Sequence, residues 1–453
     1  MNKKFLTMAA AAMMFAACSN DADTVKESAE LAQNSQEQAP VLFGAYLNRA
    51  TTRAGYAGEV TLDQLKREGF GVFGYYTDGE LFSDFAKPNF MYNEKVWSED
   101  GSVWKYEPVK YWPNEFGGEA QSDDVDRLSF FAYAPYVHVN PSTGIPDGAN
   151  DDKATGIIAM TRNSSTGDPF VKYAVSTDPT KQVDFIWGVA AGDNSPQPII
   201  GGAHQVKKGT PFLDLVKPAE RQEIMFDFHH ALAALNVQVD ALFDVDAASS
   251  TNDVDANSKI YIRSITFDGI ATEGAFNLNQ AVEGAAWSEL CCSNTIDEGA
   301  FTIYDGLRDG REGAGIEAAN EKTVGLNEAI IQKTASAGVT KEAVNLFNST
   351  ELDKSIYIIP ATSATTPLKV NVVYDVETED DDVITTLSDG VTKGVSVTNN
   401  ITKETTLNLE AGKKYILKLH LGMTSVKFEA AVTGWDETTA AEEVMLPINK
   451  GSN

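Results

Sequence analysis

The sequence predicts a mostly β fold with minor helix, built from antiparallel β-sandwiches. Apolar and polar residues alternate in many short runs, the pattern of a strand with one buried face and one solvated face. Gly, Pro, Asn and Asp separate these runs, as they do in turns between strands. Helical periodicity is clearest at residues 341–347 and Leu62–Glu68, and residues 207–224 could contain a further short helix, so we expect only minor helix.

The N-terminus has the pattern of a bacterial lipoprotein signal peptide. Lys3 and Lys4 precede an apolar run that ends at Cys18, and this run is shorter than the roughly 20 residues that a membrane-spanning helix needs. We therefore expect residues 1–17 to be removed and the Cys18 thiol to carry diacylglycerol. The alternative is an ordinary secretory signal with an incidental cysteine. Residues 18–40 are rich in Ser, Asp, Glu and Gln, which predicts a flexible tether.

Residues 41–47 are the first segment able to enter a core. Val41, Phe43, Ala45 and Leu47 fall on one face if this segment is a strand. The polar stretch that follows ends in glycine and contains Arg49 and Arg53, which a trypsin-like protease could reach in an exposed loop.

The remaining strands fall into two groups, for which we expect two domains, residues 41–222 and residues 223–453. Proline-containing residues 207–224 are the expected connection between them. In the first group we expect strands at residues 70–76, 90–97, 104–106, 128–136, 170–175 and 183–187. In the second we expect them at residues 225–232, 235–239, 260–265, 368–374, 415–421 and 426–432.

Composition excludes several classes of function. The chain has 65 acidic against 36 basic residues and a net charge of −29, which repels nucleic acid and anionic lipid headgroups. Its five histidines have no zinc-ligand spacing. No motif of a catalytic site or nucleotide site is present, so we expect no enzyme activity, catalytic residue, metal or cofactor.

Three further features have two interpretations each. The acidic run at residues 379–382 could bind calcium but better fits a solvated hairpin loop. Cys291 and Cys292 are adjacent, so they are either two thiols or a strained disulfide. Four aromatic residues either stack on sugars or fill the core. They are Trp97, Trp104, Tyr111 and Trp112.

The order of these features resembles the fimbrillin precursors of Bacteroides and Porphyromonas relatives. The motifs that carry the resemblance lie at residues 51–55, 69–73, 106–113, 128–136, 226–235, 357–361 and 414–435. The resemblance implies two transthyretin-like β-sandwich domains in a lipoprotein of the outer membrane. It also implies a structural subunit of a fimbrium, at the shaft, tip or anchor position.

The family resemblance further implies assembly by strand exchange. An arginine-specific protease would cut after Arg53, or else after Arg49, and remove residues 41–53. Another fimbrillin subunit would then donate a strand to the vacated groove. The donor segment of this chain would be residues 440–450, where Val444, Leu446 and Ile448 share one face although Pro447 restricts their pairing. A host or bacterial surface ligand is the remaining expected partner, and the alternative function is a glycan-binding surface lipoprotein that does not polymerise.

Overall fold

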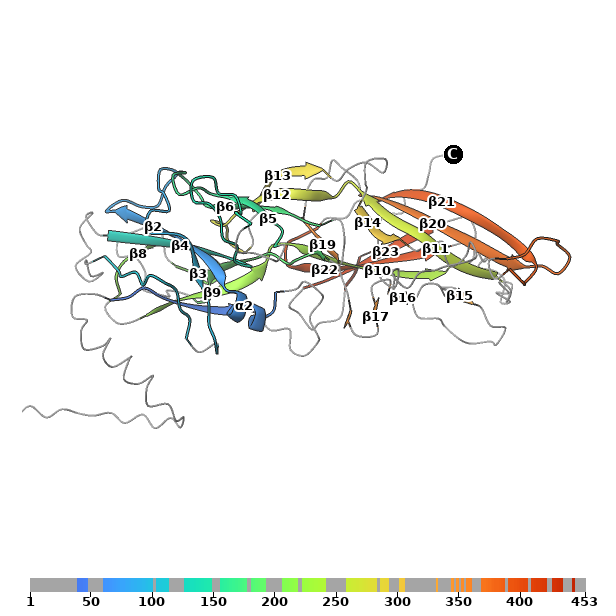
Figure 1. Ribbon diagram of the computed structural model, residues 1–453, viewed down its shortest axis with the longest axis horizontal. Coiled ribbons are helices and arrows are strands. Elements are labelled where there is room, and N and C mark those ends of the chain that lie inside the picture. The colour runs from blue at the N-terminus through green and yellow to red at the C-terminus, as the bar shows by residue number, and fades with distance from the viewer. Residues whose placement is uncertain are drawn as a thin grey trace, which may run out of the picture.

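The computed structural model confirms a mostly β fold. It describes residues 39–47, 60–100, 103–113, 126–148, 155–176, 181–192, 206–218, 222–241, 258–282, 286–292, 301–305, 331–332, 344–345, 348–349, 352–353, 356–360, 368–387, 390–405, 409–421, 426–434 and 442–444. The molecule is elongated, with the N-terminal strands at one end and the β20–β21 hairpin at the other (Figure 1). Within the described residues, no helix is long and apolar enough to cross a membrane.

A seven-stranded sheet forms the N-terminal end of the molecule, in the order β1-β9-β7-β4-β2-β3, with β8 also paired to β4. Its strands are β1 (Leu42–Leu47), β2 (Phe70–Asp78), β3 (Met91–Val96), β4 (Asp126–Ala134), β7 (Ile186–Ala190), β8 (Phe212–Leu215) and β9 (Glu223–His230). A four-stranded sheet has the order β13-β12-β6-β5. Its strands are β5 (Ile157–Met160), β6 (Phe170–Ala174), β12 (Ala271–Asn277) and β13 (Trp287–Cys292).

The C-terminal end contains a six-stranded sheet, β16-β10-β22-β23-β24 with β19 paired to β10, and a five-stranded sheet, β14-β11-β20-β21 with β15 paired to β11. The strands of the first are β10 (Ala233–Ala241), β16 (Val344–Asn345), β19 (Ile356–Ile358), β22 (Lys413–Leu421), β23 (Val426–Gly434) and β24 (Glu442–Val444). Those of the second are β11 (Ser258–Asp268), β14 (Phe301–Asp305), β15 (Ile331–Gln332), β20 (Leu368–Glu379) and β21 (Gly394–Thr405). A separate pair joins β17 (Asn348–Ser349) to β18 (Leu352–Asp353).

The expected helix at Leu62–Glu68 is present as α2. Thr61 and Gln64 form a capping box, in which the Gln64 N–H donates to the Thr61 hydroxyl at 3.2 Å and the Thr61 N–H donates to the Gln64 side chain at 2.8 Å. The helix ends at Gly69, whose φ of 82° favours glycine. The buried side chain of Leu65 anchors the helix to the core.

The prediction of a second helix, at residues 341–347, is wrong for the two residues of this segment that the structure describes. Val344–Asn345 is the short strand β16, which pairs antiparallel with Val239 and Gln238 of β10. Hydrogen bonding to a neighbouring strand outweighs a weak local helical preference, because propensity differences amount to only tenths of a kcal/mol per residue.

Among the residues that the structure describes, most strand pairs are antiparallel, as predicted, but two are parallel: β1 with β9, and β10 with β22. A parallel pair cannot be closed by a tight turn and needs a long crossover. Partners this far apart in the sequence leave no local pattern that would reveal them.

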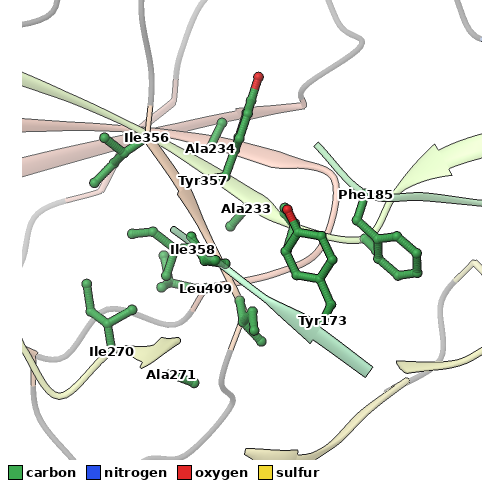
Figure 2. Close-up of a cluster of buried hydrophobic side chains, with 14 of the residues drawn as sticks. Tyr173, Phe185, Ala233, Ala234, Ile270, Ala271, Ile356, Tyr357, Ile358 and Leu409 are labelled. Carbon is green, nitrogen blue, oxygen red and sulfur yellow. The ribbon is translucent and has the colours of Figure 1, made fainter. Parts of the chain in front are cut away.

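A central core joins strands from both halves of the sequence. Figure 2 shows Tyr173 and Phe185, from the first half, beside Ala233 and Ile358 from the second, and the Tyr173 and Phe185 rings stack with centroids 5.3 Å apart. The buried side chain of Gln182 spans the same boundary by accepting from the Tyr357 N–H at 2.6 Å. Strands β6 and β12, also from the two halves, pair directly. The domain division after residue 222 stays a prediction.

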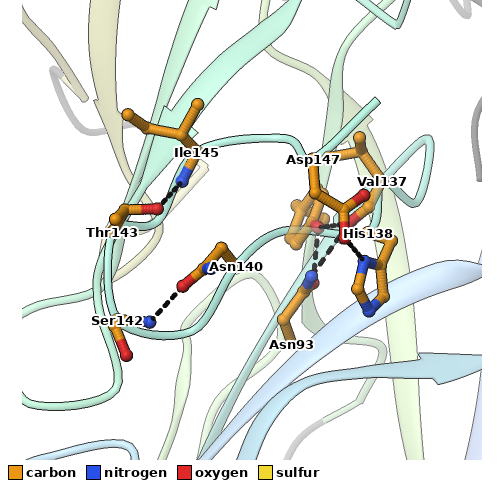
Figure 3. Close-up of polar contacts among 9 residues, drawn as sticks. Asn93, Val137, His138, Asn140, Ser142, Thr143, Ile145 and Asp147 are labelled. Atoms are coloured by element: carbon orange, nitrogen blue, oxygen red, sulfur yellow. Dashed lines mark hydrogen bonds and ion pairs between the residues drawn. The ribbon is translucent and has the colours of Figure 1, made fainter. Parts of the chain in front are cut away.

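The loop after β4 is held by short-range polar contacts (Figure 3). The Asn93 amide donates to the Val137 carbonyl at 2.8 Å, and His138 Nδ1 lies 2.8 Å from Asp147 Oδ2. Further along, the Ser142 N–H donates to the Asn140 side chain at 2.9 Å. The first of these contacts ties the loop to β3, and the other two lie within the loop.

Candidate functional site

The candidate site is β1 and the groove that it occupies. β1 lies at the end of the seven-stranded sheet and pairs along its whole length with β9, from Leu42 opposite Glu223 to Leu47 opposite Phe228. No other described strand covers its outer edge. A strand in this position can leave without disconnecting any other pair of the sheet.

One face of β1 is buried, as the alternation predicted. Val41 is fully buried, Phe43 and Ala45 are nearly so, and Leu47 packs against the same core at partial exposure. Tyr46, on the opposite face, is 56% exposed. The groove therefore holds its strand through a row of apolar side chains.

Phe43 contributes the largest side chain to the groove. Its ring centroid lies 5.4 Å from that of Tyr106, 5.5 Å from that of Phe130 and 6.1 Å from that of Phe226. The first two contacts are edge-to-face, which is a favourable geometry for aromatic pairs. Together these three rings form an aromatic pocket around residue 43.

The segment just before β1 is held from the other side by residues 106–112. The Val41 N–H donates to the Lys110 carbonyl at 2.9 Å, and the Trp112 N–H donates to the Ala39 carbonyl at 2.8 Å. The Tyr106 hydroxyl donates to the Val41 carbonyl at 2.7 Å. Burial raises the pKa of Tyr106 to about 12, so this hydroxyl keeps its proton at neutral pH.

Replacing Tyr106 tests this clamp. We expect Tyr106→Phe to lower the free energy of unfolding by about 1–3 kcal/mol, because the buried Val41 carbonyl loses its hydroxyl donor. Denaturant unfolding measures the change. Tyr111→Phe is the matched control, since Tyr111 is 40% exposed and its replacement is expected to alter stability by less than about 0.5 kcal/mol. Equal effects of the two variants would contradict the clamp.

The structure places only some of the predicted site residues. Cys18, Arg49, Arg53, Leu446 and Ile448 lie outside the described residues, so their roles stay predictions. Val444 ends β24, where it lies opposite Ala430 of β23. The start of the proposed donor segment is therefore paired within its own chain.

The aromatic residues near the groove favour the core interpretation. Trp112 is buried against Phe130, with ring centroids 6.1 Å apart, and Trp97 and Trp104 pack partly buried against the same core. Tyr111 alone of the four is exposed. Three of the four side chains are thus accounted for by packing.

The acidic run lies in the β20–β21 hairpin loop, where Asp380, Asp381 and Asp382 are exposed. This placement agrees with a solvated loop. In the part of the chain that the structure describes, no group of three or more His, Cys, Asp or Glu side chains is arranged to hold a metal ion. Cys291 and Cys292 lie on β13, opposite Glu273 and Ala271 of β12.

Sequence reasoning identified β1 but missed the residues that surround it. Tyr106, Phe130 and Phe226 come from three distant segments, and only the fold brings them to Phe43. All three residues lie in motifs that carry the family resemblance, but no local pattern links them to β1.

Comparison with known proteins supports the fold. No family model and no curated protein matches the chain. A fimbrial protein from Bacteroides vulgatus matches with a TM-score of 0.54 and 20% identity, over 88% of this chain and 99% of that one. A fimbrial assembly protein from Parabacteroides distasonis matches with a TM-score of 0.33 and 8% identity, over 90% of this chain and 100% of that one.

The first match extends over most of this chain and nearly all of the other. The resemblance inferred from the order of motifs is thereby confirmed at the level of the fold. The chain has the fold of the Bacteroides vulgatus fimbrial protein.

Proposed function

We propose that this chain is a structural subunit of a fimbrium on the bacterial outer membrane, exported as a lipoprotein and assembled by proteolysis-triggered strand exchange. The fold shared with a fimbrial protein supports the proposal. The observation that carries it is β1, an edge strand with one apolar face buried, followed directly in the sequence by Arg49 and Arg53.

Strand exchange follows from what β1 leaves behind. Its removal exposes the backbone of β9, together with apolar side chains such as Ile224, Phe226 and Phe228 that are fully buried in the intact chain. Unpaired backbone groups and exposed apolar surface are both unfavourable in water, and one incoming strand satisfies both. The vacated groove is in this sense an acceptor for a second subunit, and the role is structural, not catalytic.

The N-termini of the natural protein test the proposal. Mass spectrometry of protein from outer membranes is expected to find lipidated Cys18, and protein from fimbriae is expected to begin at Ala54 or Ala50. Protein from fimbriae that still contains residues 41–47 would rule out removal of β1. Glycan binding by cleaved protein that forms no polymer with other subunits would favour the glycan-binding alternative.

The lipid anchor gives a separate prediction. We expect Cys18→Ser to abolish incorporation of labelled fatty acid and to release the protein from the outer membrane, because a hydroxyl cannot replace the thiolate in thioether formation. Metabolic labelling and membrane fractionation measure this. Cys291→Ser is the control and should retain the label. Labelling that survives Cys18→Ser would contradict the assignment.

A further inference from the structure

The β1 groove also restricts which strand can replace β1. We propose that it accepts a strand from a different kind of subunit, one that presents an aromatic residue at the position of Phe43, and that the tail of a second copy of this chain does not fill it. This inference rests on the proposed strand exchange and adds the chemistry of the partner.

The aromatic pocket is the first restriction. Phe43 is 3% exposed and touches the rings of Tyr106, Phe130 and Phe226. Residues 436–453 include no aromatic residue, so this segment can offer the pocket only Val444, Leu446 or Ile448. An aliphatic side chain there leaves space that the surrounding rings cannot close.

The backbone of β1 supplies the second restriction. The N–H and C=O of Val41 point away from β9, toward Lys110 and Tyr106. Backbone groups of successive residues alternate in direction along a strand, so those of Leu42, Gly44 and Tyr46 point toward β9.

The hydrogen bonds of β9 independently lead to the same assignment of which backbone groups of β1 face β9. The Met225 carbonyl accepts from the Ala191 N–H at 3.1 Å, on the β7 side. By alternation, Ile224, Phe226 and Phe228 present their backbone groups to β1. In a parallel pair with the observed register, Ile224 bonds to the residues on either side of Phe43, which are Leu42 and Gly44.

Pro447 therefore falls at an unsuitable position in every register parallel to β9 that buries the apolar face of the tail. Because it lies between Leu446 and Ile448, it must occupy the position of Leu42, Gly44 or Tyr46, each of which directs its N–H toward β9. Proline has no N–H to donate. A tail inserted antiparallel to β9 would escape this restriction but would still lack an aromatic residue for the pocket.

Each register has a further defect. With Leu446 in the aromatic pocket, Pro447 replaces Gly44, where the side chain of Met225 would have to move to make room for a Cβ, and Ile448 replaces the small Ala45. With Val444 in the pocket, Glu442 takes the fully buried site of Val41. With Ile448 in the pocket, Lys450 takes the buried site of Ala45.

The first of these registers suggests a graft. It aligns residues 444–448 with residues 41–45, so the changes Leu446→Phe, Pro447→Gly and Ile448→Ala give the tail the β1 sequence at the three positions that conflict. If the groove selects as proposed, this triple variant gains the ability to fill the groove of another copy.

A competition experiment tests the inference. The full mature chain, without its lipid, receives a specific protease site between Arg53 and Ala54, is cleaved, and is loaded with a fluorescent peptide of residues 39–47. We expect the peptide of residues 440–453 to compete at least about 100-fold less well than unlabelled 39–47, because the smaller side chain and the lost ladder bond each cost on the order of tenfold. The tail peptide with the triple graft is expected to recover most of this loss.

Assembly of the full chain is the second readout. The cleaved natural chain alone should form no SDS-resistant ladder, whereas the cleaved triple variant should form one. A ladder from the natural chain, or equal competition by its tail peptide, would contradict the proposal that the donor is a different kind of subunit. Either result would remain compatible with strand exchange. Failure of the 39–47 peptide to rebind would overturn strand exchange itself, and this inference with it.

Discussion

A chain carrying both Arg49→Ala and Arg53→Ala is expected to be exported and lipidated but to remain uncleaved and absent from fimbriae. An arginine-directed protease has no other site in the segment between β1 and the buried Val60, since Arg49 and Arg53 are the only arginines there. With β1 in place, the aromatic pocket and the β9 backbone stay occupied, so no donor strand can enter. We therefore expect complete loss of incorporation into polymer.

Quantitative mass spectrometry of fimbriae and of outer membranes measures this result. Arg53→Ala alone should move the mature N-terminus from Ala54 to Ala50 while preserving assembly, because cleavage after Arg49 still releases β1. Arg67→Ala is the matched control: Arg67 is exposed in the last turn of α2, and its loss should change neither cleavage nor assembly. Normal assembly of the double variant would show that β1 is not removed by cleavage at these arginines.

The second large effect is expected from Phe43→Ala, which should lower the free energy of unfolding of the uncleaved chain by about 3–5 kcal/mol. The change removes a nearly buried ring from three aromatic neighbours and leaves a cavity that the rigid strands around it cannot close. Denaturant unfolding should show a lower midpoint with an unchanged slope, because the area exposed on unfolding stays nearly the same.

Tyr46→Ala is the control within the same strand. Tyr46 is 56% exposed, so its replacement should alter stability by less than about 0.5 kcal/mol. Equally small losses from both variants would mean that β1 contributes through its backbone alone. In that case the aromatic pocket could not select a donor strand, and the inference about the partner would fail with it.

Much of the fold could be predicted because strand alternation is a local property. Residues 41–47 alternate with period two, so their burial followed once they formed a strand, and the same holds for β22. Helix α2 was also found from its own residues. The strand at Val344–Asn345 was missed because its conformation depends on β10, more than a hundred residues earlier in the chain.

The candidate site divides in the same way. The sequence by itself determined which side chains of β1 and of the tail share a face, because side chains alternate along any strand whatever strand it pairs with. It also placed Pro447 between two apolar residues. Only the tertiary structure decided that β1 runs parallel to β9, that Tyr106, Phe130 and Phe226 enclose Phe43, and that alternate backbone groups of β1 face β9. These three features depend on segments that lie far apart in the sequence and are brought together by packing. Local residue patterns do not determine which strand another strand pairs with.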